Sequence, residues 1–192
     1  MCAWVTSVVI FLYSRQESIN STLRPIVAED LGIVTPDVEA LRDACGYPGM
    51  RVLQFAFGET ADHPFLPHRY VANTVVYTGT HDNDTSEGWW NAADASERAF
   101  VQAYLGPGDE AMSRRLIHLA CQSVARLAIY PLQDVLGLDS RYRMNLPGTM
   151  GGANWSWRVD AAALDGESAC WLKTLAAATG RAAFEALRAG LA

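Results

Sequence analysis

The 192-residue sequence lacks the patterns that would assign it to several common functional classes. It has no run of Lys and Arg, and its net charge is −6, from 15 basic and 21 acidic side chains. A phosphate backbone is therefore not expected as its main partner. No apolar stretch reaches the ~18–20 residues that a bilayer span requires. We predict a protein that binds neither nucleic acid nor a membrane.

Paired metal ligands and a dense disulfide framework are also missing. The four cysteines, Cys2, Cys45, Cys121 and Cys170, are far apart and form no C-x-x-C pair, and the four histidines form no H-E-x-x-H motif. Zinc ribbons and disulfide-rich domains need closer spacing. The glycine-rich segment 148–152 is not followed by Gly-Lys-Ser/Thr, so it is no phosphate-binding loop. We predict free thiols in a reducing cytoplasm and no metal site.

What the sequence does contain is enough apolar material for a packed core. Half of the residues are hydrophobic and 10% are aromatic, a composition typical of one domain or of part of a larger one. Apolar runs rich in Val and Ile alternate with helical patterns, which favours parallel βα units. We expect strands at 26–28, 50–57, 74–78 and 127–130, helices at 35–45, 86–91, 94–105, 110–126 and 172–191, and irregular structure at 141–158.

The first residues differ from the rest, because 1–13 are nearly all apolar and 14–24 are polar. We interpret 1–13 as a buried helix or as a start upstream of the true fold. A signal peptide is the minor alternative, since the segment has no charged start and no Ala-x-Ala exit. In the helix at 35–45, Thr35 is the expected N-cap and Pro36 the first helical residue, with Val38 and Leu41 in an apolar stripe.

Acidic side chains follow the predicted strands where each one ends. They are Glu29-Asp30, Glu59, His81-Asp82 with Asp84, and Gln133-Asp134. Loops at the carboxyl ends of parallel strands meet at one edge, so these carboxylates are expected to converge. A pair of carboxylates suits glycosidic bond chemistry, in which one protonates the leaving oxygen and another attacks or stabilises a positively charged centre.

Structural roles are the alternatives for the same residues. Asp30 could cap the following turn and Asp84 could cap the helix at 86–91. Trp155, like Trp89, Trp90 and Trp157, is interpreted as a core residue rather than a sugar platform. His81 lies beside two acids on a loop, which favours a functional role over a packed one.

Several long motifs then carry a resemblance to one family. AEDLG at 28–32, YPGMRVLQFAF at 47–57, FLPHRY at 65–70, YTGTHDNDTSEGWW at 77–90 and YPLQDVLGL at 130–138 occur in order, followed by RMNLPGT and NWSWR within 143–158. This order resembles the 4-α-glucanotransferases of glycoside hydrolase family 77, the amylomaltases and plant disproportionating enzymes. The resemblance covers about residues 25–160.

The resemblance implies an α/β fold, a TIM (β/α)8 barrel, and retaining transfer of α-1,4-glucan segments without a cofactor. Glu29 matches the general acid/base and Asp82 the carboxylate that stabilises the transition state. His81 and Asn145 match substrate-binding residues, and Glu59 stands where relatives often carry an Asp near the sugar. The implied partners are maltooligosaccharides and starch- or glycogen-derived α-1,4-glucans. The implied location is the cytoplasm or a plastid, and the Ala- and Arg-rich, acidic composition favours the cytoplasm.

One element of the family pattern is absent. Its nucleophile is an Asp in an Arg-x-Asp segment upstream of AEDLG, and residues 1–24 contain no Asp. We therefore expect residues 1–24 to be a divergent segment and 25–192 to be the C-terminal half of the barrel, strands five to eight, with no nucleophile and with a missing N-terminal half as a further partner. The alternatives are a non-catalytic glucan-binding remnant and an α-amylase-type hydrolase.

Overall fold

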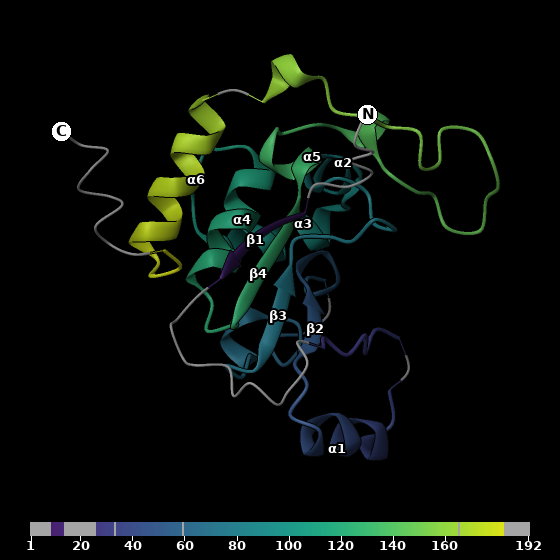
Figure 1. The fold of residues 1–192 in the computed structure, drawn as a ribbon, viewed down its shortest axis with the longest axis vertical. Helices are drawn as coiled ribbons and strands as arrows, with labels where there is room; N and C mark the ends of the chain where they lie inside the picture. The colour runs from purple at the N-terminus through teal and green to yellow at the C-terminus, as the bar shows by residue number, and fades with distance from the viewer. Residues whose placement is uncertain (1–8, 14–25, 33, 59, 165, 183–192) are drawn as a thin grey trace, which may run out of the picture.

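The structure, a computed structural model, describes residues 9–13, 26–32, 34–58, 60–164 and 166–182 (Figure 1). Strands β1 (Val9–Tyr13), β2 (Gly49–Val52), β3 (Thr74–Tyr77) and β4 (Leu127–Pro131) form one sheet in the order β1-β4-β3-β2. β2, β3 and β4 are parallel, and β1 pairs antiparallel with β4. The helices are α1 (Pro36–Ala44), α2 (Ser86–Ala92), α3 (Ala95–Leu105), α4 (Met112–Gln122), α5 (Leu132–Val135) and α6 (Gly166–Ala178).

The central parallel strands confirm the prediction from their Val- and Ile-rich runs. Val75 of β3 lies opposite Leu127 of β4, and Met50 of β2 lies opposite Val75. The strand predicted at 50–57 ends at Val52, because the chain then turns into a 3-10 helix at Leu53–Phe55. Strand β2 is thus shorter than the apolar run at 50–57 from which it was predicted.

Two predictions near the N-terminus are wrong. No strand forms at 26–28, where the Ala28 amide donates one backbone bond to the Pro48 carbonyl at 3.0 Å. Residues 9–13 form strand β1 rather than a buried helix, while residues 1–8 lie outside the described part. A short apolar run does not show by periodicity whether it is helix or strand, so its pairing partner decides.

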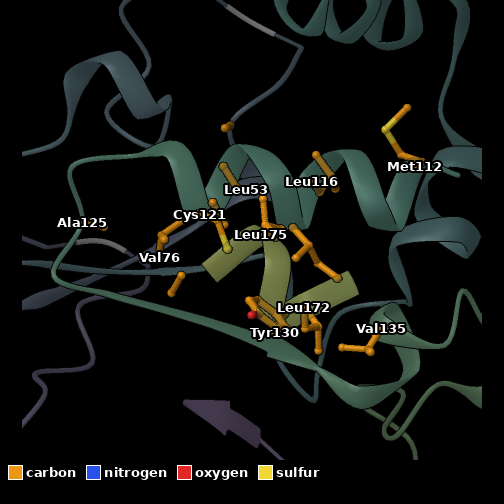
Figure 2. Packing of buried hydrophobic residues seen from close by; sticks show 14 of the residues in the cluster. Leu53, Val76, Met112, Leu116, Cys121, Ala125, Tyr130, Val135, Leu172 and Leu175 are labelled. Carbon is orange, nitrogen blue, oxygen red and sulfur yellow. The ribbon is translucent and has the colours of Figure 1, made fainter. Parts of the chain in front are cut away.

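The helices from α2 onward cover one face of the sheet, and α1 lies apart from them (Figure 1). Side chains alternate along a strand, so Val76, Ala128 and Tyr130 face the helices and join the core. Figure 2 shows Leu116 and Cys121 of α4 and Leu172 and Leu175 of α6 packed in that layer. Side chains on the opposite face of the sheet, among them Tyr77 and Ile129, line a cleft.

Helix α1 begins and ends as predicted but is not packed as predicted. Thr35 precedes it, Pro36 opens it, and Gly46 follows with φ +71°, a conformation that suits glycine at a helix end. Its expected apolar stripe is exposed, with Val38 48% and Leu41 65% accessible. The apolar face of α1 therefore contributes little to its packing, and the ion pair between Arg42 and Asp30 ties the helix to the segment before it.

Two further helices differ from their predicted bounds. Helix α4 ends at Gln122, and α6 runs over Gly166–Ala178 instead of beginning at 172, while residues 183–191 of the predicted helix lie outside the described part. Residues 141–158 are irregular, as predicted, apart from a 3-10 turn at Ser140–Tyr142. In the part of the chain that the structure describes, no helix is both long and apolar enough to cross a bilayer.

Candidate active site

A cleft of about 740 Å³ opens on the sheet face opposite the helices. Tyr77, Leu127 and Ile129 from β3 and β4 form part of its lining, because their side chains point away from the helical layer. The loop after β3 and the irregular segment before α1 supply polar groups at the same cleft, among them Asp82 and Glu29. The predicted convergence is therefore seen for these two acids and for Asp84 and Gln133, although no strand forms at 26–28 before Glu29.

Asp82 is held by residues that lie far along the chain. The Asn145 side-chain amide donates to Asp82 Oδ1 at 2.6 Å, and the Arg143 guanidinium donates to the Asp82 carbonyl at 2.5 Å. His81 Nε2 lies 3.5 Å from the same Oδ1. Both His81 and Asp82 have about half of their side chains exposed. A fixed, accessible carboxylate of this kind can meet developing positive charge on a ligand.

The loop after β3 and the loop around 143–155 are bonded to each other along the cleft. The backbone amide of Asn145 donates to the backbone carbonyl of His81 at 3.1 Å. The Arg143 guanidinium also donates to the backbone carbonyl of Asn145 at 2.7 Å. The Trp155 indole lies 5.0 Å from the His81 ring, between centroids. Arg143 and Trp155 were missed from sequence, although both lie in the quoted motifs RMNLPGT and NWSWR.

Glu29 lies on the same cleft, on the irregular segment before α1. Its Oε1 accepts a hydrogen bond from the Leu31 amide at 2.8 Å, and its side chain is exposed. The carboxyl group can reach a ligand in the cleft and exchange a proton with it. This placement is compatible with the acid/base role that the resemblance implies.

The side chain of Asp30, next to Glu29, is buried beside two arginines. Its carboxylate accepts from Arg42 at 2.6 Å, from Arg51 at 3.0 Å and from the Met50 amide at 2.6 Å. Burial alone would raise the pKa of Asp30, but the Met50 amide and the two arginines outweigh it, so the pKa is lowered. Asp30 ties the Glu29 segment to α1 and β2, and among the described residues its carboxylate accepts no bond from the following turn, which it was expected, as an alternative, to cap.

The lowered pKa of Asp30 predicts a pH-dependent contribution to stability. A carboxylate with a lowered folded pKa stabilises the fold fully above its unfolded pKa of about 3.9, and loses that effect as the pH falls through the folded value. Asp30→Asn should therefore destabilise the protein at pH 7 by about 1–3 kcal/mol. The difference from wild type should shrink below about pH 4. Urea unfolding from pH 7 to 3 measures it.

The exposed Asp62 offers a matched control for that experiment. Asp62→Asn should leave the unfolding midpoint almost unchanged at every pH, since exposed polar substitutions usually shift stability within ±0.5 kcal/mol. A loss at Asp30→Asn that stays constant down to pH 3 would contradict the ion-pair explanation.

Two further acids of the predicted set, Asp134 and Asp84, make structural hydrogen bonds. Asp134 is fully buried and accepts from Thr78 Oγ1 and from the amide and hydroxyl of Ser86. Asp84 accepts from the Thr85 amide and Ser140, and it does not cap α2. The cap of α2 is Thr85, whose hydroxyl accepts from the Gly88 amide at 3.1 Å. These acids hold the loop that carries His81 and Asp82.

Glu59 lies outside the described residues, so its predicted position near the sugar stays a prediction. Among the side chains that the structure describes, no group of three or more His, Cys, Asp or Glu could hold a metal ion. Cys45, Cys121 and Cys170 are free thiols. The polar groups that line the cleft include two carboxylates, Glu29 and Asp82, and the imidazole of His81, which can exchange protons and form hydrogen bonds with a ligand.

Comparison with known proteins places these observations in one family. A glycoside hydrolase 77 family model, described as 4-alpha-glucanotransferase, matches residues 6–163. A 4-alpha-glucanotransferase of Thermus thermophilus is 52% identical over 165 residues, which cover 82% of this chain and 33% of that protein. A chloroplastic/amyloplastic 4-alpha-glucanotransferase of Solanum tuberosum is 56% identical over 135 residues, 70% of this chain and 23% of that protein.

A solved structure, an amylomaltase from Streptococcus agalactiae in complex with acarbose, matches with a TM-score of 0.78 and 31% identity. The match covers 82% of this chain and 32% of that one. The chain spans about a third or less of the length of these relatives. Its α/β fold with a parallel sheet is amylomaltase-like, and the chain belongs to the glycoside hydrolase 77 family of 4-alpha-glucanotransferases.

Proposed function

We propose that this chain carries part of the active site of a retaining 4-alpha-glucanotransferase, which moves α-1,4-glucan segments between maltooligosaccharides. The observation that carries the proposal is the shared cleft of Glu29, His81 and Asp82, with the Asn145 amide bonded to the Asp82 carboxylate at 2.6 Å. We assign the acid/base role to Glu29 and transition-state stabilisation to Asp82. His81, Asn145 and Glu59 are assigned to sugar binding.

The proposed reaction uses one carboxyl group twice. Glu29 gives its proton to the glycosidic oxygen as the donor bond breaks, and the leaving sugar departs with that proton. The Glu29 carboxylate then takes the proton from the 4-hydroxyl of the acceptor, which attacks the covalent glucosyl intermediate. Asp82 opposes the positive charge that develops on the sugar ring. Glu29 supports this role because its exposed carboxyl reaches the cleft.

The covalent step needs a second carboxylate on the other face of the sugar, about 5–5.5 Å from the acid. We propose that it comes from an upstream Arg-x-Asp segment outside the 192 residues. On this proposal residues 25–192 belong to the half of a (β/α)8 barrel that holds strands five to eight, to which β2, β3 and β4 contribute three strands, and 1–24 form a divergent segment. Residues 1–24 contain no Asp, which supports this division.

An α-1,4-glucan is the proposed ligand of the cleft, and acarbose, bound by the Streptococcus agalactiae relative, is a suitable probe. A second hollow of about 600 Å³ shares Asp82, Asp84 and Arg143 with the first. Phe55, 48% exposed, lines this second hollow. We assign this second hollow to the acceptor sugar, because it adjoins the proposed reaction centre at Asp82. We also propose a cytoplasmic location, which the widely spaced cysteines favour.

Binding of acarbose to the 192-residue protein tests this proposal. Calorimetry should detect binding to wild type, and Asp82→Ala should weaken it by about tenfold or more, because the truncation removes a fixed hydrogen-bonding carboxylate. Asp109→Ala, which changes an exposed acid in the loop before α4, is the control and should bind like wild type. Equal affinity in wild type and Asp82→Ala would contradict the assignment of this cleft.

A further inference from the structure

We propose that Trp155 is a sugar-stacking residue of the cleft, with its indole face covering one side of a bound glucosyl ring beside His81. This inference rests on the proposed function and adds a binding residue to the same site. It replaces the interpretation of Trp155 as a core residue. The argument uses its exposure, its backbone conformation and its neighbours.

Trp155 differs from the other tryptophans of the described residues in its surroundings. Trp89, Trp90, Trp157 and Trp171 pack against the hydrophobic core. Trp155 is 49% exposed and lines the cleft. Its large apolar surface therefore faces the space where a ligand would lie instead of contributing to the fold.

The backbone holds Trp155 in this position at a cost. Trp155 has φ +60°, and no other non-glycine residue in the described part has a positive φ. A bulky side chain rarely adopts this left-handed conformation, and such strain persists where the surrounding structure fixes it. Here the Trp155 amide donates to the Met144 carbonyl at 2.8 Å, and Arg158 donates to the Trp155 carbonyl at 3.1 Å.

The result of this conformation is a pair of rings at the cleft. The indole lies 5.0 Å from the His81 imidazole, with 40° between the planes. His81 lies 3.5 Å from the Asp82 carboxylate, which Asn145 also contacts. The flat apolar face of the indole thus lies beside the hydrogen-bonding groups of His81 and Asp82 in the cleft.

A pyranose ring presents the same combination of surfaces. Its C–H face is apolar and suits an aromatic platform, while its hydroxyls lie around the rim and suit carboxylate, imidazole and amide partners. Stacking on Trp155 would orient the hydroxyls of that ring toward His81 and Asp82. A neutral oligosaccharide is therefore the ligand class that this arrangement fits.

Binding of maltoheptaose to the 192-residue protein tests the inference with two variants. Trp155→Asn removes the indole but keeps a residue that tolerates positive φ, so the loop can retain its path. It should weaken binding by about tenfold, as truncating an aromatic anchor commonly does. Trp155→Phe keeps an aromatic platform and should stay within about threefold of wild type.

Fluorescence adds a readout that a purely structural role would not change. Maltoheptaose should alter the tryptophan emission of wild type, and most of the change should be lost in Trp155→Phe although that variant still binds, with a remainder from Trp89 at the second hollow. Trp90→Phe, which changes a tryptophan packed on the core, should keep the response. The unfolding midpoint of Trp155→Phe should match wild type, since the indole is not part of the core, and that of Trp155→Asn should equal or exceed it, because asparagine relieves the backbone strain.

The outcomes separate this inference from the proposed function. Binding by wild type with equal affinity in Trp155→Asn overturns the stacking role and leaves the proposed function standing. A fluorescence response of unchanged size in Trp155→Phe also overturns it. Failure of wild type to bind maltoheptaose at all overturns both.

Discussion

Glu29→Gln should abolish glucan transfer in a chimaera that joins residues 25–192 of this chain to the preceding part of the Thermus thermophilus relative. Removing a positioned general acid/base costs about 10²–10⁴ in rate, and glutamine cannot donate or accept the proton. The unmodified chimaera should convert maltotriose into glucose and longer oligomers. Chromatography of the products over time measures both rates.

Two controls make the result interpretable. Glu39→Gln makes the same chemical change on the exposed helix α1 and should leave the rate within about twofold, because surface substitutions away from a site have small effects. The 192-residue protein alone should form no product, because on our proposal it lacks the nucleophile. Transfer by that protein alone would refute the missing nucleophile, and an active Glu29→Gln chimaera would refute the acid/base role.

Asp134→Ala should produce the largest loss of stability. The Asp134 carboxylate is fully buried and accepts three hydrogen bonds, of 2.5 Å from Thr78 Oγ1, 2.7 Å from the Ser86 amide and 2.8 Å from the Ser86 hydroxyl. Truncation leaves buried donors without an acceptor, which should cost about 3 kcal/mol or more. That is a large fraction of the ~5–15 kcal/mol that typically separates folded from unfolded states.

The control for this prediction is Asp139→Ala. Asp139 pairs with Arg141 at the surface, and its side chain is 40% exposed. Removing such a contact should cost less than about 1 kcal/mol. Urea unfolding of the two variants compares them directly, and equal midpoints would show that the Asp134 hydrogen bonds do not stabilise the fold.

Asp134 also explains how the fold presents the site. Its partners Thr78 and Ser86 lie just before and just after the loop that carries His81 and Asp82. Burial raises the pKa of Asp134, and the Ser86 and Thr78 donors act in the opposite direction. One buried carboxyl group from α5, which follows β4, thus fixes both ends of the functional loop after β3.

Sequence reasoning located strands β3 and β4 and most helices, because their periodicity and capping are local properties. It failed at 26–28 and at 9–13, where the outcome depends on whether a distant strand pairs with the segment. It also failed to foresee that Val38 and Leu41 of α1 are exposed. An apolar stripe favours burial, but tertiary packing decides whether a partner is present.

The sequence by itself determined the family, the acids that follow the strands, and the motifs that contain Asn145 and Trp155. Only the tertiary structure separated Asp82, which faces the cleft, from Asp30 and Asp134, which are buried among donors. All three are aspartates that follow predicted strands, so their local sequence patterns are similar. Their roles differ because burial and hydrogen-bond partners come from residues 12 to 63 positions away.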